Sequence, residues 1–269
     1  MTEELQIRIC GDSSLPTLVY LPGLHGDWTL IGAFQVALKG RVRFVVVTYP
    51  RSLTWSPNDY ADAVDLMLQR SGIKTGWLLA ESFGSQVAWA ILSKSNKFFL
   101  VEGLVLAGGF VKHPWKWGPP LVRWLVRHTP KIIGRWLWKI YEAYSRFRHR
   151  HSPDALKLID EFRDRRTDLD LQAMERRLAS LDDYDPRPIA CQTKLPVYYL
   201  AGLVDPLVPW FLVRRWLRLN CPGYRCGKTF LADHNVLATA AAGTADTVVA
   251  WMETRKKGCC RRSDVIFES

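Results

Sequence analysis

The feature that most constrains this chain is a series of short segments that are apolar at nearly every position rather than at alternate positions. A strand of this kind must be buried on both faces, which is typical of a parallel sheet covered by helices. Six such segments are expected to be strands, the last with a weaker signal: Thr17–Leu21, Val42–Thr48, Gly76–Ala80, Leu100–Ala107, Pro196–Ala201 and Lys228–Leu231. The segment Leu5–Ile9 is expected to add an edge strand.

Segments with helical character lie between these strands. One of them follows Ser56 and Pro57, two residue types that favour the start of a helix. The expected helices are Thr29–Leu38, Asn58–Gln69, Ser85–Leu92, Pro209–Leu219 and Ala245–Glu253. The alternation of strands and helices predicts an α/β fold with a mostly parallel central sheet flanked by helices.

The length of 269 residues favours a single domain with room for an insertion. The interval Val111–Lys194 has no strand signal and is expected to be helical. We therefore predict a core formed by residues 1–112 and 191–269, with a helical cap at 113–190.

The start MTEELQIRI lacks the features of a signal peptide, and no run of about 18 uncharged apolar residues occurs, which predicts a cytoplasmic protein.

The pentapeptide AESFG places Ser82 between a predicted strand and a predicted helix. A sharp strand-to-helix turn exposes a serine hydroxyl above the sheet, in front of the helix N-terminus. Ala80 and Gly84 are small enough for strand and helix to pass closely, although the usual pattern has glycine where Ala80 stands. Ser82 is therefore predicted to be a nucleophile. Glu81 is expected to be a solvated or hydrogen-bonded neighbour rather than a residue that tunes the site.

A nucleophilic serine needs a base, and the base needs an acid that orients it. Asp205 follows the fifth predicted strand and His234 follows the sixth. Both are therefore expected beyond the carboxyl ends of the parallel strands. Asp233 is a weaker candidate acid, because a residue adjacent to His234 cannot easily orient its ring. Ser82, Asp205 and His234 together predict a catalytic triad.

A glycine-containing loop, LPGLHGD, follows the first apolar strand. Gly23 allows the backbone to turn an N–H group toward the site, so the amide of Leu24 is predicted to bind an oxyanion. The second oxyanion amide is predicted to be that of Phe83, next to the serine.

The loops LPGLHGD, AESFG, GLVDPLVP and ADHN together resemble the α/β-hydrolase superfamily, especially its small carboxylesterase-like members similar to pimeloyl-carrier-protein methyl ester esterase. The resemblance covers both flanks, and the insertion lies where that superfamily carries its cap. It departs at Ala80 and at Pro22, where many relatives have glycine and histidine. It implies a serine hydrolase that cleaves a small-molecule carboxylic ester, with thioesterase, acyltransferase or a non-catalytic binding protein as alternatives.

No metal or organic cofactor is expected, since the cysteines lack zinc-ligand spacing and no phosphate-binding or dinucleotide glycine motif occurs.

Between Val111 and Arg150 the chain has ten basic residues, the single acid Glu142 and five tryptophans. Three interpretations stay open: a cap that lines the site for a lipophilic chain, peripheral contact with an anionic membrane, and docking of an acidic carrier protein. Nucleic acid is not expected, because no recognised binding motif accompanies the charge.

Overall fold

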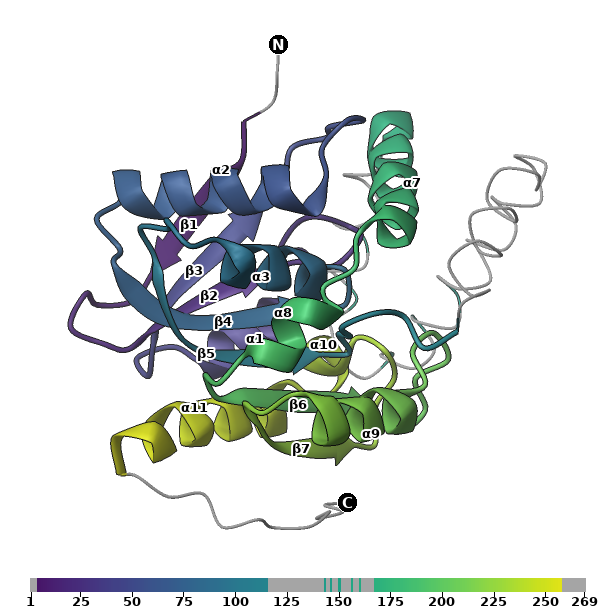
Figure 1. Cartoon of the computed structure of the whole chain (residues 1–269). Helices are drawn as coiled ribbons and strands as arrows, with labels where there is room; N and C mark the ends of the chain where they lie inside the picture. The colour runs from purple at the N-terminus through teal and green to yellow at the C-terminus, as the bar shows by residue number, and fades with distance from the viewer. Residues whose placement is uncertain are drawn as a thin grey trace.

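The computed structural model describes residues 4–115 and 167–257, together with positions 143, 146, 150, 156 and 160. Seven strands form one sheet in the order β1-β3-β2-β4-β5-β6-β7 (Figure 1). The edge strand β1 is antiparallel to β3, and every other neighbouring pair is parallel. The strands are β1 (Gln6–Cys10), β2 (Thr17–Leu21), β3 (Arg43–Thr48), β4 (Thr75–Glu81), β5 (Leu100–Ala107), β6 (Val197–Gly202) and β7 (Tyr224–Phe230).

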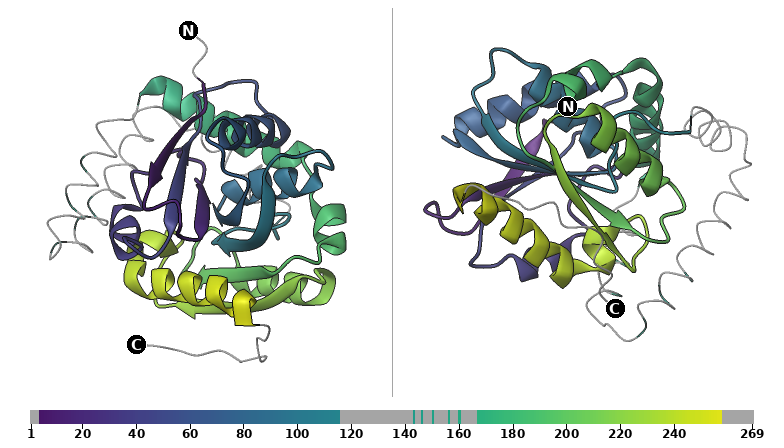
Figure 2. Two further views of the ribbon diagram at one scale, coloured as in Figure 1. Left: turned by 90° about the vertical axis from the view of Figure 1, so that its left-hand side faces the viewer. Right: turned by 60° about the horizontal axis from the view of Figure 1, so that its bottom comes forward.

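Helices cover both faces of the sheet, as the views in Figure 2 show. One core cluster includes side chains of α2, α3, α8 and α9, and a second cluster, on the other face, includes side chains of α1, α10 and α11. The helices among the described residues are α1 (Gly32–Ala37), α2 (Pro57–Arg70), α3 (Gly84–Ser93), α7 (Asp168–Asp183), α8 (Arg187–Gln192), α9 (Trp210–Asn220), α10 (Val236–Thr239) and α11 (Ala241–Lys257). The fold is the mostly parallel, helix-flanked sheet that the sequence predicts.

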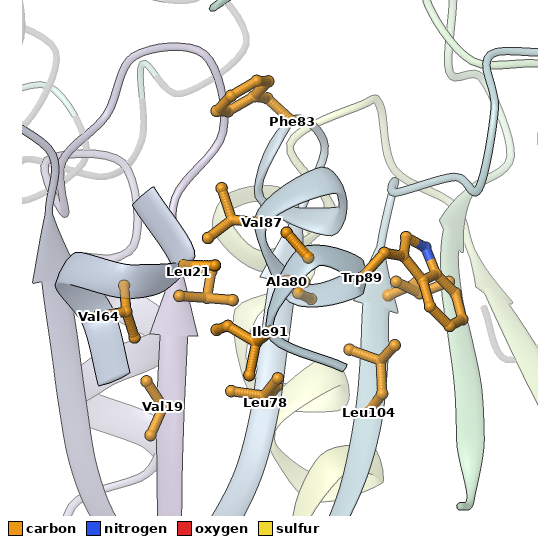
Figure 3. Close-up of a cluster of buried hydrophobic side chains, with 14 of the residues drawn as sticks. Val19, Leu21, Val64, Leu78, Ala80, Phe83, Val87, Trp89, Ile91 and Leu104 are labelled. Carbon is orange, nitrogen blue, oxygen red and sulfur yellow. The ribbon is translucent and has the colours of Figure 1, made fainter. Parts of the chain in front are cut away.

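Helix α3 is the most deeply buried helix of the core, with every residue from Gly84 to Ile91 buried. Its side chains pack with those of the central strands and α2 (Figure 3). Trp89, one of the largest buried side chains, also donates its indole N–H to the carbonyl of Phe110. Because α3 is packed on all sides, the turn that precedes it has a fixed position relative to the sheet.

Three predicted elements differ from the structure by three or more residues at one end or both. Helix α11 (Ala241–Lys257) extends four residues beyond the predicted Ala245–Glu253 at each end. Helix α1 begins at Gly32 rather than Thr29, because the Asp27 carboxylate accepts hydrogen bonds from the Thr29 amide and hydroxyl and holds a turn there. Strand β7 begins at Tyr224, four residues before the predicted start, and Leu231 lies outside it. Its polar residues and its edge position removed the apolar signal on which that prediction depended.

The described part of the predicted cap contains helix α7 and the first four residues of helix α8. A capping box of Thr167 and Asp170 starts α7, and the ammonium of Lys112 donates to the carbonyls of Leu181, Asp182 and Tyr184 at its end. The rest of the predicted cap lies outside the described residues, so its domain boundaries stay a prediction. Within residues 4–115 and 167–257, no helix is long and apolar enough to cross a membrane.

Candidate active site

Ser82 lies on the sharp turn between β4 and α3. It has a φ of 48°, the only positive φ of a non-glycine residue in the described part of the chain. Its amide donates to the Ala107 carbonyl at 3.0 Å, and its carbonyl accepts from the Ser85 amide at 3.0 Å. A left-handed residue of this kind costs about 1–3 kcal/mol and persists only where surrounding contacts impose it. The turn thus presents the serine side chain at the carboxyl end of the sheet.

The structure brings the three residues of the predicted triad together. His234 Nε2 lies 2.9 Å from Ser82 Oγ, and His234 Nδ1 lies 2.8 Å from Asp205 Oδ2. The Asp205 side chain is fully buried, while 12% of the His234 side chain is exposed. This continuous chain of hydrogen bonds joins residues that are 152 and 29 positions apart in the sequence.

Each oxygen of the Asp205 carboxylate has its own hydrogen-bond partners. Its Oδ1 accepts hydrogen bonds from the amides of Leu207 and Val208, at 2.8 and 2.9 Å, which leaves Oδ2 directed at His234. The alternative acid, Asp233, instead accepts from the Asn235 amide and the Thr239 hydroxyl, at 3.0 and 3.3 Å. Asp233 therefore stabilises the turn into α10, and no hydrogen bond joins its carboxylate to His234 in the described residues.

The predicted oxyanion loop contacts the serine turn. A Cβ built on Gly23 would lie 3.4 Å from Ser82 Cβ, so the two backbones approach closely. The loop is closed by a hydrogen bond from the Gly26 amide to the Gly23 carbonyl, and the Gly26 carbonyl accepts from the Tyr49 amide. Leu24 lies within this turn. Phe83 stands at the N-cap of α3, where backbone amides have no carbonyl partner within the helix.

Glu81 is buried beneath this site rather than solvated. Its carboxylate accepts a short hydrogen bond from the Tyr20 hydroxyl, and its Oε2 lies 4.0 Å from His25 Nε2 in the oxyanion loop. Burial, followed by the charge of Glu81, raises the pKa of Tyr20 well above its ordinary value. Tyr20 therefore stays protonated and donates to Glu81. Of the two alternatives that the sequence left open, the hydrogen-bonded neighbour is the observed one.

Among the described residues, no group of three His, Cys, Asp or Glu side chains lies close enough to hold a metal ion. Cys10, Cys191, Cys221 and Cys226 form no disulfide. Cys259 and Cys260 lie outside the described residues.

Sequence reasoning missed two residues that support the site. The hydroxyl of Ser85 donates to the Ser82 carbonyl and accepts from the Phe110 amide, and so joins the serine turn to the segment after β5. Its place in the AESFGS sequence was a usable signal. The second is Arg177, buried on α7, whose guanidinium donates to the Leu24 carbonyl at 2.7 Å. Nothing in the local sequence distinguishes it from its neighbour Arg176.

Comparison with known proteins yields one matching family model, the alpha/beta hydrolase family, over residues 18–247. An enol-lactonase from Burkholderia xenovorans LB400 has a TM-score of 0.71 at 18% identity, over 93% of this chain and 96% of that chain. An esterase from Exiguobacterium antarcticum has a TM-score of 0.73 at 17% identity, over 93% and 95%. A thermophilic esterase from Thermogutta terrifontis has a TM-score of 0.72 at 17% identity, over 93% of both chains.

A search of curated protein sequences found no match. The similarity to the solved structures, all below 20% identity, establishes the fold. The family model spans most of the chain, including the segments that carry Ser82, Asp205 and His234. The chain belongs to the alpha/beta hydrolase family.

Proposed function

We propose that the protein is a serine hydrolase that cleaves a small-molecule carboxylic ester through an acyl-enzyme intermediate. The observation that carries this proposal is the hydrogen-bonded series Ser82 Oγ, His234 and Asp205, with distances of 2.9 and 2.8 Å. The positive φ of Ser82 supports it further, because strained backbone of this kind clusters at functional sites.

In the proposed reaction, Ser82 Oγ attacks the ester carbonyl carbon while His234 Nε2 takes the hydroxyl proton. The negative charge that develops on the carbonyl oxygen is stabilised by the amides of Leu24 and Phe83. The C–O bond then breaks, and His234 gives its proton to the leaving alcohol. A water molecule, deprotonated by His234, attacks the acyl carbon, and the acid is released as Ser82 regains its proton.

The substrate class is proposed from the similar solved structures and from the sequence of the predicted cap. The solved structures named above include two esterases and a lactonase, and the bonds that these enzymes cleave are acyl–oxygen bonds. We propose a lipophilic acyl or alkyl group, because the predicted cap carries apolar residues at helical spacing that could line the site: Ile133, Trp136, Leu137, Ile140, Tyr144 and Phe147. The narrower resemblance to pimeloyl-carrier-protein methyl ester esterase stays a prediction.

The experiment that tests the proposal labels the protein with a fluorophosphonate probe and measures turnover of nitrophenyl esters of increasing acyl length. We expect labelling at Ser82, and Ser82→Ala should lose both labelling and at least about 10³-fold in kcat/KM, because only the reacting hydroxyl is removed. Ser93→Ala is the control variant, because it removes a serine hydroxyl at the other end of α3, where that hydroxyl donates to the Ala90 carbonyl. A Ser82→Ala protein that keeps a tenth of the wild-type turnover would contradict the assignment.

The same experiment separates the alternatives. A non-catalytic binding protein with a collapsed site is not labelled, whereas a hydrolase is labelled stoichiometrically. A thioesterase turns over acyl thioesters faster than the matched oxygen esters. An acyltransferase forms the acyl-enzyme rapidly but deacylates slowly in water. Adding an acceptor alcohol or amine then speeds deacylation and yields the acylated acceptor, an ester or an amide, instead of the free acid.

A further inference from the structure

Arg177 is a buried cation on α7 that contacts the oxyanion loop. Only 2% of the residue is exposed. Its guanidinium donates to three neutral oxygens: Nη1 to the Leu24 carbonyl at 2.7 Å, Nη2 to the Pro50 carbonyl at 2.9 Å and Nε to the Tyr60 hydroxyl at 3.3 Å. Burying a charge is costly unless its hydrogen-bonding groups are satisfied, so this arrangement has to be held by the surrounding structure.

The oxyanion loop is shaped around this guanidinium. A Cβ built on Gly26 would lie 2.7 Å from Arg177 Nη1 and 2.9 Å from Cζ, so a side chain at this position would displace the guanidinium. The carbonyl of Leu24, which accepts from Nη1, is attached to the same Cα as the amide predicted to bind the oxyanion. Holding this carbonyl restricts rotation about Leu24 and so limits the directions in which its N–H can point.

Two aromatic rings connect the same guanidinium to Phe83, the second predicted oxyanion residue. Its Cζ lies 5.6 Å from the ring centroid of Tyr49 and 5.9 Å from that of Tyr60, within the range of cation–π contacts. Both rings pack edge-on against Phe83, with centroids 6.2 and 6.0 Å away. Arg177 thus contacts the Leu24 carbonyl directly. It contacts Phe83 only indirectly, through the buried rings of Tyr49 and Tyr60.

Other contacts attach α7 to the segment after β3. Arg51 Nε donates to Asp170 Oδ1 at 2.7 Å, and Arg176 Nη2 donates to the Thr54 carbonyl at 3.1 Å. These interactions hold the helix in place without touching the oxyanion loop. Docking of α7 therefore does not by itself require Arg177, and Arg176 offers a matched arginine on the same helix.

We propose that Arg177 is a positioning residue of the oxyanion hole, through which α7 sets the orientation of the Leu24 and Phe83 amides. This inference rests on the proposed serine hydrolase function. A positioned oxyanion donor contributes most when charge develops on the carbonyl oxygen, and contributes little to binding of the uncharged ester. Loss of Arg177 should therefore lower kcat and leave KM nearly unchanged.

The test compares Arg177→Met and Arg177→Lys with the control Arg176→Met, using the full chain. Removing one oxyanion donor costs about 10²–10³ in kcat, so misplacing such donors in Arg177→Met should lower kcat by about 10- to 100-fold. Arg177→Lys should fall between this variant and wild type, since an ammonium cannot reach all three oxygens. Arg176→Met should keep kcat within about twofold.

A second readout separates positioning from stability. A trifluoromethyl ketone forms a tetrahedral adduct with a catalytic serine, whereas the matched methyl ketone binds without an oxyanion. In Arg177→Met, affinity for the trifluoromethyl ketone should fall by the same factor as kcat, while affinity for the methyl ketone stays constant. Equal losses for both ketones, or an unchanged kcat in folded protein, would overturn the proposal.

If the Arg177 variants do not fold, Tyr60→Phe decides the question, because it removes only the hydroxyl that accepts from Nε. A selective two- to fivefold loss of trifluoromethyl ketone affinity supports the proposal, and no selective loss overturns it. Failure of the underlying function is distinguishable, because wild-type protein would then resist fluorophosphonate labelling at Ser82. That result would overturn both proposals, whereas a labelled wild type with unselective Arg177 variants overturns only this one.

Discussion

The imidazole of His234 contacts both other members of the proposed triad, so its tautomer determines what Ser82 can do. Oδ1 of Asp205 is occupied by two backbone amides, and Oδ2 is an acceptor directed at Nδ1. A carboxylate can only accept a hydrogen bond, so the proton must lie on Nδ1. Nε2 is then left as an acceptor toward the hydroxyl of Ser82, as a general base requires.

The Asp205→Asn variant keeps the shape of the side chain but changes the group that faces His234. An asparagine amide can donate to Nδ1 and thereby favour the tautomer whose proton lies on Nε2, so we expect kcat for nitrophenyl esters to fall by about 10³–10⁴-fold. Binding of the methyl ketone should persist. Asp233→Asn is the matched control, since Asp233 supports only the turn into α10. Normal activity in Asp205→Asn together with an inactive Asp233→Asn would transfer the acid role to Asp233.

The position of the serine depends on how closely α3 passes the end of β2. A Cβ built on Gly84 would lie 2.2 Å from the Leu21 carbonyl oxygen and 2.8 Å from that of Pro22. Neither atom belongs to a flexible side chain, so an alanine at this position must move α3 or the loop that carries Leu24. The first turn of α3 and the oxyanion loop are therefore fixed relative to each other by a backbone contact.

We expect Gly84→Ala to lower the free energy of unfolding by about 3 kcal/mol or more, at the upper end of overpacking effects. The measurement is urea denaturation followed by tryptophan fluorescence, with fluorophosphonate labelling of the folded protein. Gly40→Ala is the control, because Gly40 also lacks a side chain but a Cβ there meets nothing within 4 Å. Its positive φ of 74° should cost about 1–2 kcal/mol. Equal losses in the free energy of unfolding for Gly84→Ala and Gly40→Ala would contradict the steric explanation.

The strands were predictable because burial on both faces makes β2 to β6 apolar at most positions. Ser82, Asp205 and His234 could be placed because each lies within four residues of the end of a strand. Strand β7 was misplaced because Arg225, Gly227 and Lys228 interrupt its pattern at the sheet edge. The burial of Arg177 was not predictable. Arg176 and Arg177 are adjacent and chemically identical, and only the packing of α7 against the oxyanion loop distinguishes them.

At the scale of the whole molecule, the net charge of +11 is concentrated between Val111 and Arg150. The structure assigns local roles to two of these ten basic residues. Lys112 donates to carbonyls at the end of α7, and Arg146 forms an ion pair with Asp160. Most of the other eight, and most of the neighbouring tryptophans, lie outside the described residues. They are the residues on which contact with an anionic membrane would depend.

We propose that this basic, tryptophan-rich segment binds anionic bilayers, and we expect the protein to sediment with phosphatidylserine-rich vesicles at low salt. A basic residue near such a surface contributes about 1 kcal/mol, and screening at several hundred millimolar salt should release the protein. Replacing Arg127, Arg135 and Lys139 with glutamine should lower the partition coefficient at least tenfold without changing nitrophenyl acetate turnover. The charge-matched control replaces Lys39, Arg70 and Lys74, which are exposed and precede β3 or β4 in the chain, whereas Ser82 follows the carboxyl end of β4. Protein that stays in the supernatant at low salt, or equal losses in the two triple variants, would exclude this role for the segment.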